Sequence, residues 1–270
     1  MASRRRTRTS SVNKVQLVKD RITTPEDSFQ YLKMVAYGNN GRGKTRFGAS
    51  GPKPFIVDCN EKGTLSIRHF PDVEVFPAQV WTDLDLAFWY MKAGKHDRQT
   101  VVIDNVTSAA QLCMNFVMDD ELSRDATKDP AMAGKREWGK VAMLMKTTIN
   151  NFRNLDMHVV FLAQEKRGFV EDEDEEAPEI FPAVSPSVRE TLTAAVDVIG
   201  RMYVTEVVKK VSVDGKTRKR AMPEYRMLLG PSERYVTKDR TEAGLPGIIR
   251  LDDSFDNLTR LIDRIKKGAA

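Results

Sequence analysis

The stretch Gly38-Asn39-Asn40-Gly41-Arg42-Gly43-Lys44-Thr45 decides the fold of this chain, because it satisfies the pattern G-x-x-x-x-G-K-[ST] at every fixed position. The apolar run Met34-Val35-Ala36-Tyr37 leads into it, which predicts a strand, a glycine-rich loop and a helix in that order. Glycines let backbone N–H groups close around phosphates, and the positive end of the following helix strengthens the attraction. The stretch therefore predicts a binding site for a nucleoside triphosphate.

The residue types at the end of the loop predict how the ligand is held. Lys44 is expected to reach the β- and γ-phosphates, and the Thr45 hydroxyl is expected to complete the coordination shell of Mg²⁺. The predicted cofactors are therefore Mg²⁺ and a nucleoside triphosphate, which we take to be ATP, with GTP as the open alternative. The residues predicted to surround the nucleotide follow one another along the chain: Gly38, Asn39, Asn40, Gly41, Arg42, Gly43, Lys44, Thr45 and Arg46.

Length and composition limit the fold classes and functions that fit this chain. A chain of 270 residues can bury one substantial α/β core. The two cysteines lack the spacing of a metal site, and the three histidines are scattered, so we interpret them as ordinary surface or core residues. The sequence has neither a long apolar run nor the apolar segment of a signal peptide, which predicts a cytoplasmic protein without a membrane partner.

Charge is concentrated at the amino terminus. Residues 1–12 contain Arg4, Arg5, Arg6 and Arg8 among Ser and Thr, which predicts a disordered basic arm. Such an arm can add salt-dependent contacts to phosphates, or it can serve only as a solubilising tail. Residues 13–270 are then expected to form a single domain.

Strand-like and helix-like segments alternate along that domain, which predicts a mostly parallel sheet covered by helices on both faces. After the glycine-rich loop, the predicted strands are 54–58, 73–76, 100–104 and 157–164. The predicted helices are 83–93, 107–118, 136–155 and a carboxy-terminal helix at 254–267. The fold class is thus predicted to be α/β, and Trp138 is expected to anchor its helix in the core.

Asp104 ends a buried strand in the manner of a Walker B element. The apolar run Val101-Val102-Ile103 precedes it, and ligands of open α/β sheets bind at the carboxyl ends of the strands. Asp104 is therefore predicted to support Mg²⁺ together with Thr45. The next residue is Asn105, where many P-loop ATPases have a water-activating glutamate.

A carboxylate from another strand must then activate the attacking water. The tip of the predicted strand 54–58 is followed by Glu61, which we expect to accept a proton from the water or to orient it. Asp58 is the competing candidate. Glu61 as a solvated turn residue before Gly63 remains an alternative.

The order of these elements resembles the RecA-type ATPase core, and in detail the phage-encoded, RecA-like ATPases of the Sak single-strand-annealing group. The similar segments spread over residues 31–240, and the loop pattern is the most specific of them. They are Tyr37-Gly38 to Thr45, Glu61-Lys62-Gly63, Val102-Ile103-Asp104, Glu137-Trp138-Gly139, Phe161-Leu162-Ala163-Gln164-Glu165 and Thr237-Lys238-Asp239-Arg240.

The resemblance implies roles for two further sites. Gln164 matches the glutamine that senses the γ-phosphate and passes its state to a DNA-contacting loop, although a buried glutamine that caps a strand is the alternative. Lys238 and Arg240 match a basic pair that reaches into the ATP site of a neighbouring subunit, so a homo-oligomer, either a ring or a filament, is implied. The Lys-x-Arg spacing would place both on one face of a strand. A solvent-facing basic edge strand is the alternative for this pair.

Residues 203–229 are predicted to form a β-hairpin, because Asp214-Gly215 is a strong two-residue turn signal between strand-like runs. Six basic residues near the tip are predicted to contact DNA: Lys209, Lys210, Lys216, Arg218, Lys219 and Arg220. A solvated hairpin whose lysines prevent edge pairing is the alternative. The acidic run 171–176 would repel DNA, so it either avoids DNA, shields the site or binds a protein partner.

These features together predict a RecA-like P-loop ATPase that depends on Mg²⁺ and binds single-stranded DNA in phage recombination, annealing or replication. A single-strand-binding or replication protein is a further candidate partner, and the host cytoplasm is the expected location. Two alternatives remain open. One is a helicase-like motor that translocates on nucleic acid, and the other is a nucleotide-dependent scaffold or loader that recruits a protein.

Overall fold

The computed structural model of this chain describes residues 14–22, 30–129, 132–168, 179–213 and 216–268. Within these residues, nine strands form one central sheet in the order β11-β9-β8-β1-β5-β4-β2-β3, with β10 also pairing with β8. The strands from β8 to β3 pair in parallel, and β9, β10 and β11 are antiparallel additions. Their bounds are β1 (Lys33–Tyr37), β2 (Pro54–Asp58), β3 (Glu74–Pro77), β4 (Thr100–Asp104), β5 (His158–Ala163), β8 (Val198–Val213), β9 (Lys216–Leu228), β10 (Lys238–Asp239) and β11 (Ile248–Leu251).

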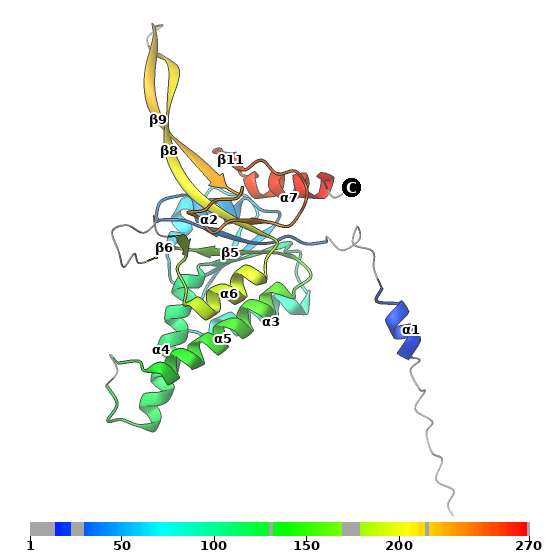
Figure 1. Ribbon diagram of the computed structural model, residues 1–270, viewed down its shortest axis with the longest axis vertical. Helices are drawn as coiled ribbons and strands as arrows, with labels where there is room; N and C mark the ends of the chain where they lie inside the picture. The colour runs from blue at the N-terminus through cyan, green and yellow to red at the C-terminus, as the bar shows by residue number, and fades with distance from the viewer. Residues whose placement is uncertain (1–13, 23–29, 130–131, 169–178, 214–215, 269–270) are drawn as a thin grey trace, which may run out of the picture.

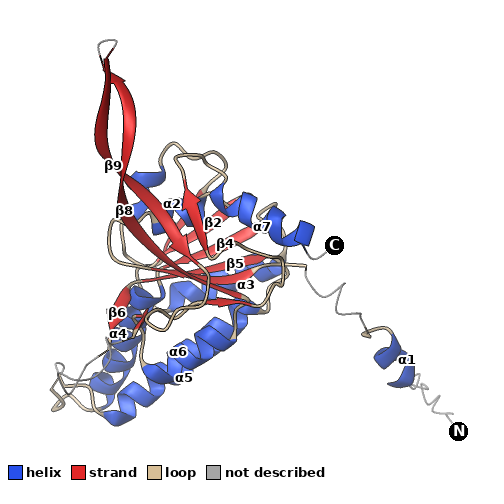
Figure 2. Ribbon diagram, turned by 45° about the horizontal axis from the view of Figure 1, so that its top comes forward, coloured by secondary structure: helices blue, strands red, loops and turns tan. Residues whose placement is uncertain are grey.

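Helices cover both faces of this sheet, which confirms the predicted α/β fold class (Figure 2). One face packs against α3 (Thr82–Ala93), α4 (Val106–Arg124), α5 (Lys135–Arg153) and α6 (Pro186–Ala194). The other packs against α2 (Lys44–Ala49), the 3₁₀ helix η2 (Gly63–Ile67) and α7 (Asn257–Gly268). The short helix α1 spans Lys14–Lys19. In the described part of the chain, no helix has the length and apolar character to cross a membrane.

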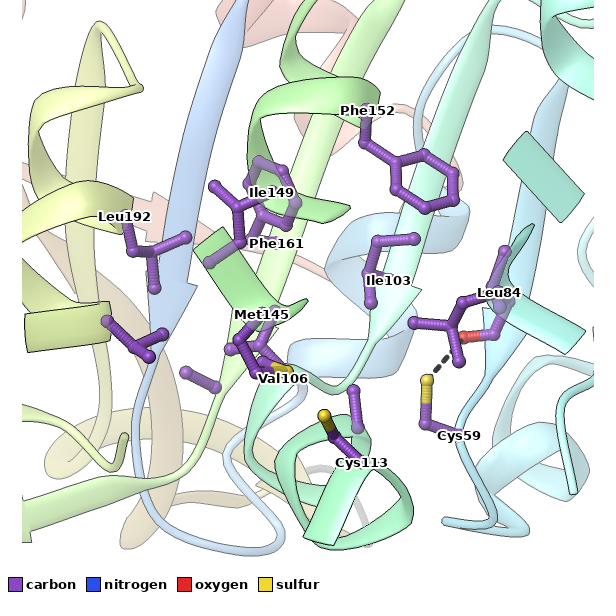
Figure 3. Close-up of a cluster of buried hydrophobic side chains, with 14 of the residues drawn as sticks. Cys59, Leu84, Ile103, Val106, Cys113, Met145, Ile149, Phe152, Phe161 and Leu192 are labelled. Carbon is purple, nitrogen blue, oxygen red and sulfur yellow. Dashed lines mark hydrogen bonds between the residues drawn. The ribbon is translucent and has the colours of Figure 1, made fainter. Parts of the chain in front are cut away.

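The alternating side chains of the parallel strands divide the core into two clusters, because successive residues of a strand point to opposite faces. On the first face, Ile103 and Phe161 from the strands lie opposite Met145 and Phe152 of α5 and Leu192 of α6 (Figure 3). The second cluster joins α2 and α7 to the other strand face. The strands β1, β2, β4 and β5 are buried on both faces, so their packing determines where the loops at their carboxyl ends lie.

The strand order determines which of these loops meet. β5 pairs with β1 on one side and with β4 on the other. The residue after β5, Gln164, therefore leaves the sheet between the glycine-rich loop that follows β1 and Asp104 at the end of β4. Because all three strands are parallel, these groups gather at one edge of the sheet.

The predicted hairpin is present and longer than expected. β8 and β9 pair from Arg201–Leu228 out to Val213–Lys216, and the ribbon projects away from the body of the domain (Figure 1). β8 begins at Val198 rather than near 203, because its first four residues pair in parallel with β1. The root of the hairpin is therefore part of the central sheet.

Trp138 does not anchor its helix in the core, since its side chain is 52% exposed. The neighbouring Glu137 is buried instead, and its carboxylate accepts hydrogen bonds from the Gly134 backbone N–H (2.8 Å) and from Lys128 Nζ (2.5 Å). Adjacent residues of an α-helix point about 100° apart, so turning Glu137 inward turns Trp138 toward solvent.

The carboxy-terminal helix agrees closely with its prediction, with α7 beginning at Asn257 rather than at residue 254. Three other predicted features, the basic arm 1–12, the acidic run 171–176 and the turn 214–215, lie outside the described residues.

Candidate nucleotide site

The glycine-rich loop joins β1 to α2 in a conformation that depends on its glycines. Gly41 and Gly43 have φ values of 71° and 82°, which residues other than glycine rarely adopt. Gly38 faces the backbone of β8, where a Cβ atom would lie only 2.4 Å from the carbonyl oxygen of Met202. The loop is therefore shaped by its own backbone and by its contact with the root of the hairpin.

Lys44 lies inside this loop at the first position of α2. Its Nζ donates hydrogen bonds to the carbonyl oxygens of Gly38 (2.9 Å) and Asn39 (3.0 Å) and to Gln164 Oε1 (3.1 Å). Burial lowers the pKa of Lys44, while the carboxylates of Asp104 and Glu61 oppose that shift. These contacts hold the ammonium group at the centre of the loop, where a phosphate would meet it.

Thr45 and Asp104 face one another across the start of α2. The Thr45 hydroxyl donates to Asp104 Oδ2 over 2.6 Å, and the Asp104 side chain is buried. A hydroxyl and a carboxylate are oxygen donors of the kind that Mg²⁺ prefers, so these residues fit the ion. Within the described ranges, no group of three or more His, Cys, Asp or Glu side chains could hold a metal by itself. Phosphate and water would supply the remaining ligands of the ion.

The environment of Asp104 predicts a pH dependence. Burial raises the pKa of this carboxyl to about 6, with Glu61 and Asp58 adding to the shift and the Thr45 hydrogen bond opposing it. A cation favours the ionised carboxylate, so protons compete with Mg²⁺ below that pKa. We expect the affinity for the Mg²⁺–nucleotide complex to rise with pH through about 6 and then to level off, by up to about tenfold per pH unit.

The comparison variant is Asp104→Asn, which cannot titrate. Calorimetric titrations of both proteins between pH 5 and 8 would separate the effect of protonating this carboxyl from the effect of protonating the nucleotide. Protonation of the nucleotide changes the affinity of both proteins equally. Equal pH slopes for the two proteins would show that Asp104 contributes nothing.

Glu61 and Asp58 differ in what their carboxylates do. Asp58 is buried, and its Oδ1 accepts from the backbone N–H groups of Glu61 (2.8 Å) and Lys62 (3.3 Å), so it holds the turn after β2. Glu61 is exposed at the cavity, and its Oε1 accepts a hydrogen bond from the Ser108 hydroxyl on α4. The carboxylate that is directed toward the cavity is therefore that of Glu61.

Gln164 follows β5 and directly precedes β6 (Glu165–Arg167), which pairs with β7 (Ile180–Pro182) in a second, two-stranded sheet. Its backbone N–H donates to Thr107 Oγ1 over 3.1 Å, and its side chain reaches Lys44. The structure thus brings Gln164 into contact with the loop, directly before the segment that leads out of the sheet.

Glu165 connects this segment to two other elements, a link that the sequence interpretation missed. Its Oε1 accepts from Asn39 Nδ2 in the loop over 2.6 Å, and its Oε2 accepts from Arg201 Nε of β8 over 3.1 Å. The Arg201 guanidinium carbon lies 4.1 Å from the centroid of the Tyr235 ring. No local sequence pattern predicts this network, because its members come from four distant parts of the chain.

Lys238 and Arg240 are arranged differently from the predicted basic pair. Lys238 Nζ donates to the carbonyl oxygens of Thr193 and Val196, each over 2.6 Å, so it is engaged at the end of α6 in its own subunit. Arg240 follows the two-residue strand β10 and is exposed. Its backbone N–H donates to the carbonyl oxygen of Asp197, just before β8, at the edge of the sheet opposite the glycine-rich loop.

The basic residues of the hairpin lie on β8 and β9. Lys209 pairs directly with Arg220, and Lys210 pairs with Lys219, in the antiparallel register. Paired residues share a face and neighbouring pairs alternate, so both faces of this part of the ribbon are basic. Lys216 and Arg218 belong to β9 by their backbone pairing. Among the basic residues whose side chains the structure describes, Lys209, Lys210, Lys219 and Arg220 do not line the cavity at the glycine-rich loop.

A cavity of about 370 Å³ lies at the loop, within the range that ligand sites occupy. It is lined by the polar residues already described, among them Lys44, Thr45, Glu61, Asp104 and Gln164. It is also lined by apolar side chains that sequence reasoning missed: Phe70, Met202, Tyr225 and Leu251.

The central sheet, the glycine-rich loop and the facing Thr45 and Asp104 define the P-loop NTPase class. Comparison with protein families gives the narrower assignment: a family model described as an AAA domain matches residues 30–241. This chain belongs to that family of nucleotide-binding domains. None of the curated proteins compared with the chain matches it.

Proposed function

We propose that this protein hydrolyses ATP in a Mg²⁺-dependent reaction that is coupled to the binding of single-stranded DNA. The observation that carries the proposal is the convergence of Lys44, Thr45, Asp104, Glu61 and Gln164 around one cavity. These residues come from four separate segments, and each has the chemistry that one part of a phosphoryl-transfer site requires.

The proposed roles follow from the contacts. Lys44 exchanges its bonds to loop carbonyls for bonds to the β- and γ-phosphates. Thr45 and Asp104 hold Mg²⁺, which when bound neutralises charge that develops on the phosphate oxygens. Glu61, positioned by the Ser108 hydroxyl, accepts the proton of the attacking water. Gln164 contacts the γ-phosphate through an amide that can both donate and accept hydrogen bonds.

The position of Gln164 also supports the coupling to DNA. It lies between Lys44 and the two-stranded β6–β7 sheet, so a change at the γ-phosphate can be passed to that segment. This arrangement and the order of the motifs favour the RecA-like ATPases of the phage Sak group, with a role in recombination, annealing or replication.

The hairpin is the proposed DNA-binding element. Two pairs of like charges, Lys209 with Arg220 and Lys210 with Lys219, lie directly opposite one another in the ribbon. Like charges in such positions destabilise a hairpin, and charges that serve only to protect an edge need not be paired in this way. A phosphate backbone would offset the repulsion, because it supplies the counter-charge along the strand.

A variant with four substitutions tests the role of the hairpin. Replacing Lys209, Lys210, Lys219 and Arg220 with alanine should weaken binding of single strands of any sequence. The slope of log affinity against log salt should also become shallower, by about 0.7 for each phosphate that the variant no longer neutralises. The measurement is fluorescence anisotropy with labelled oligonucleotides at several salt concentrations.

The matched control removes four exposed lysines elsewhere, namely Lys92, Lys95, Lys266 and Lys267, and lowers the net charge equally. If the control and the hairpin variant lose affinity alike, binding depends on overall charge and the hairpin has no special role.

We propose further that the active form is a homo-oligomer, in which Arg240 of one subunit contacts the nucleotide of the next. Its exposure at the edge of the sheet opposite the glycine-rich loop argues against a contact with the nucleotide of its own subunit and suits a head-to-tail arrangement. Lys238 is left out of this role because it is bonded to α6.

One experiment tests the proposed function as a whole: the ATPase rate with and without single-stranded DNA, together with particle mass from light scattering at the assay concentration. Stimulation by DNA in an oligomeric sample is the expected result. A rate that DNA leaves unchanged would contradict the coupling. Displacement of a strand from a duplex would favour the translocating motor, and a DNA-independent rate together with a stable protein complex would favour the scaffold.

A further inference from the structure

The cavity at the glycine-rich loop extends over side chains for which phosphate binding provides no role. Phe70, Met202, Tyr225 and Leu251 are apolar or aromatic, and all four line it together with the loop residues. A triphosphate and its metal require polar partners, so these side chains indicate a second, apolar part of the same ligand.

Tyr225 is the central residue of this apolar part. It lies on β9 at the root of the hairpin, and its ring approaches to 3.5 Å from the place where a Cβ atom on Gly43 would be. Leu251 of β11 pairs directly with it and therefore lies on the same face of the sheet. The Tyr225 side chain remains 38% exposed, so an aromatic surface stays open beside the phosphate loop.

The segment before α7 provides a further wall of the cavity. Arg46 at the start of α2 stacks over the Phe70 ring, with 5.8 Å between the guanidinium carbon and the ring centroid, and forms an ion pair with Asp253 over 3.5 Å. The segment is fixed internally, since Asp252 Oδ1 accepts from the Ser254 backbone N–H over 3.0 Å. The residues from Leu251 to Ser254 lie beyond residue 241, outside the part of the chain that matches the AAA domain.

We propose that Tyr225, with Leu251 and the segment 252–254, binds the purine base of the nucleoside triphosphate. This inference rests on the proposed function, because it assumes that the phosphates occupy the glycine-rich loop. An aromatic ring next to the phosphate loop offers a face on which a base stacks, and the two fused rings of a purine cover more of that face than a pyrimidine does. The site therefore selects purine over pyrimidine nucleotides.

The test compares the affinities of ATP, CTP and inorganic tripolyphosphate for wild type, Tyr225→Ala and Tyr225→Leu by isothermal titration calorimetry. Wild type should bind ATP more tightly than CTP. Both variants should bind ATP about ten- to a hundredfold more weakly, the loss expected for one stacked base, and should bind tripolyphosphate as wild type does. The leucine variant keeps apolar packing at this position if the alanine variant does not fold.

Two controls make the outcome unambiguous. Tyr225→Phe should retain the affinity for ATP, and Tyr203→Ala, on the opposite face of the hairpin root, should not change it. If Tyr225→Leu binds ATP as tightly as wild type, while Lys44→Ala still lowers the affinities for ATP and tripolyphosphate, only the proposed base site is overturned. Unchanged tripolyphosphate affinity in Lys44→Ala would overturn the phosphate site, and with it the proposed function.

Discussion

Replacing Lys44 with alanine is expected to lower the rate of ATP hydrolysis by at least about 10²–10³-fold, the loss seen when one preorganised group that stabilises developing charge is removed. The ammonium group is held by three hydrogen bonds inside the loop, at the point where the β- and γ-phosphates would lie. Nucleotide affinity should fall as well, because a charge-assisted hydrogen bond to phosphate is removed. Steady-state hydrolysis and calorimetric binding would measure the two effects.

The control is Lys53→Ala, which removes a surface lysine that pairs with Asp97 away from the cavity and should leave both quantities unchanged. Lys44→Met keeps most of the side-chain length, so it separates loss of charge from loss of packing. Near-normal turnover in either Lys44 variant would show that this loop does not bind the hydrolysed nucleotide.

Glu61→Gln is expected to leave ATP binding intact and to lower turnover by about 10²–10⁴-fold, the usual contribution of a general base. The amide keeps the shape of the side chain and can still accept the hydrogen bond from Ser108, but it cannot take a proton. A single-turnover measurement beside a binding titration would distinguish a loss of chemistry from a loss of affinity.

Asp58→Asn is the matched comparison, since its side-chain oxygen can still accept the two backbone hydrogen bonds that hold the turn after β2. Its turnover should stay within a few-fold of wild type. If Asp58→Asn loses turnover and Glu61→Gln does not, the roles of the two carboxylates must be exchanged.

The sequence predicted the central part of the fold well, because the signals there are local. A strand that is buried on both faces must be a short apolar run, and β2 and β4 begin and end at the predicted residues. The glycine-rich loop is also a local signal, because each fixed position of its pattern is required by the backbone of the loop itself. The placement of Lys44, Thr45 and Asp104 near one another followed from these two patterns.

The apolar part of the cavity could not be predicted, because it depends on packing between distant segments. Tyr225 is 182 positions away from Gly43, and nothing in its immediate sequence distinguishes it from any other tyrosine on a strand. The hydrogen bonds of Lys238 were missed for the same reason, because the carbonyl groups that accept them belong to the last turn of α6 and to Val196, just after that helix. Trp138 shows the opposite error, because the sequence predicts this aromatic residue to lie in the core. The buried carboxylate of the neighbouring Glu137, which caps the helix, instead determines which face of the helix is turned inward.

The continuity of β8 has a mechanical consequence. Its first residues pair with β1, which carries the glycine-rich loop, and its last residues pair with β9 far from the body of the domain. At about 3.3 Å per residue, a strand of sixteen residues is about 50 Å long. Its first four residues belong to the central sheet, so about 40 Å of the strand lies beyond the pairing with β1. If the ribbon moves as a rigid body, a tilt of about 5° beside the loop displaces its far end by roughly 3.5 Å. A small rearrangement at the cavity would thus become a larger movement at the far end of the hairpin.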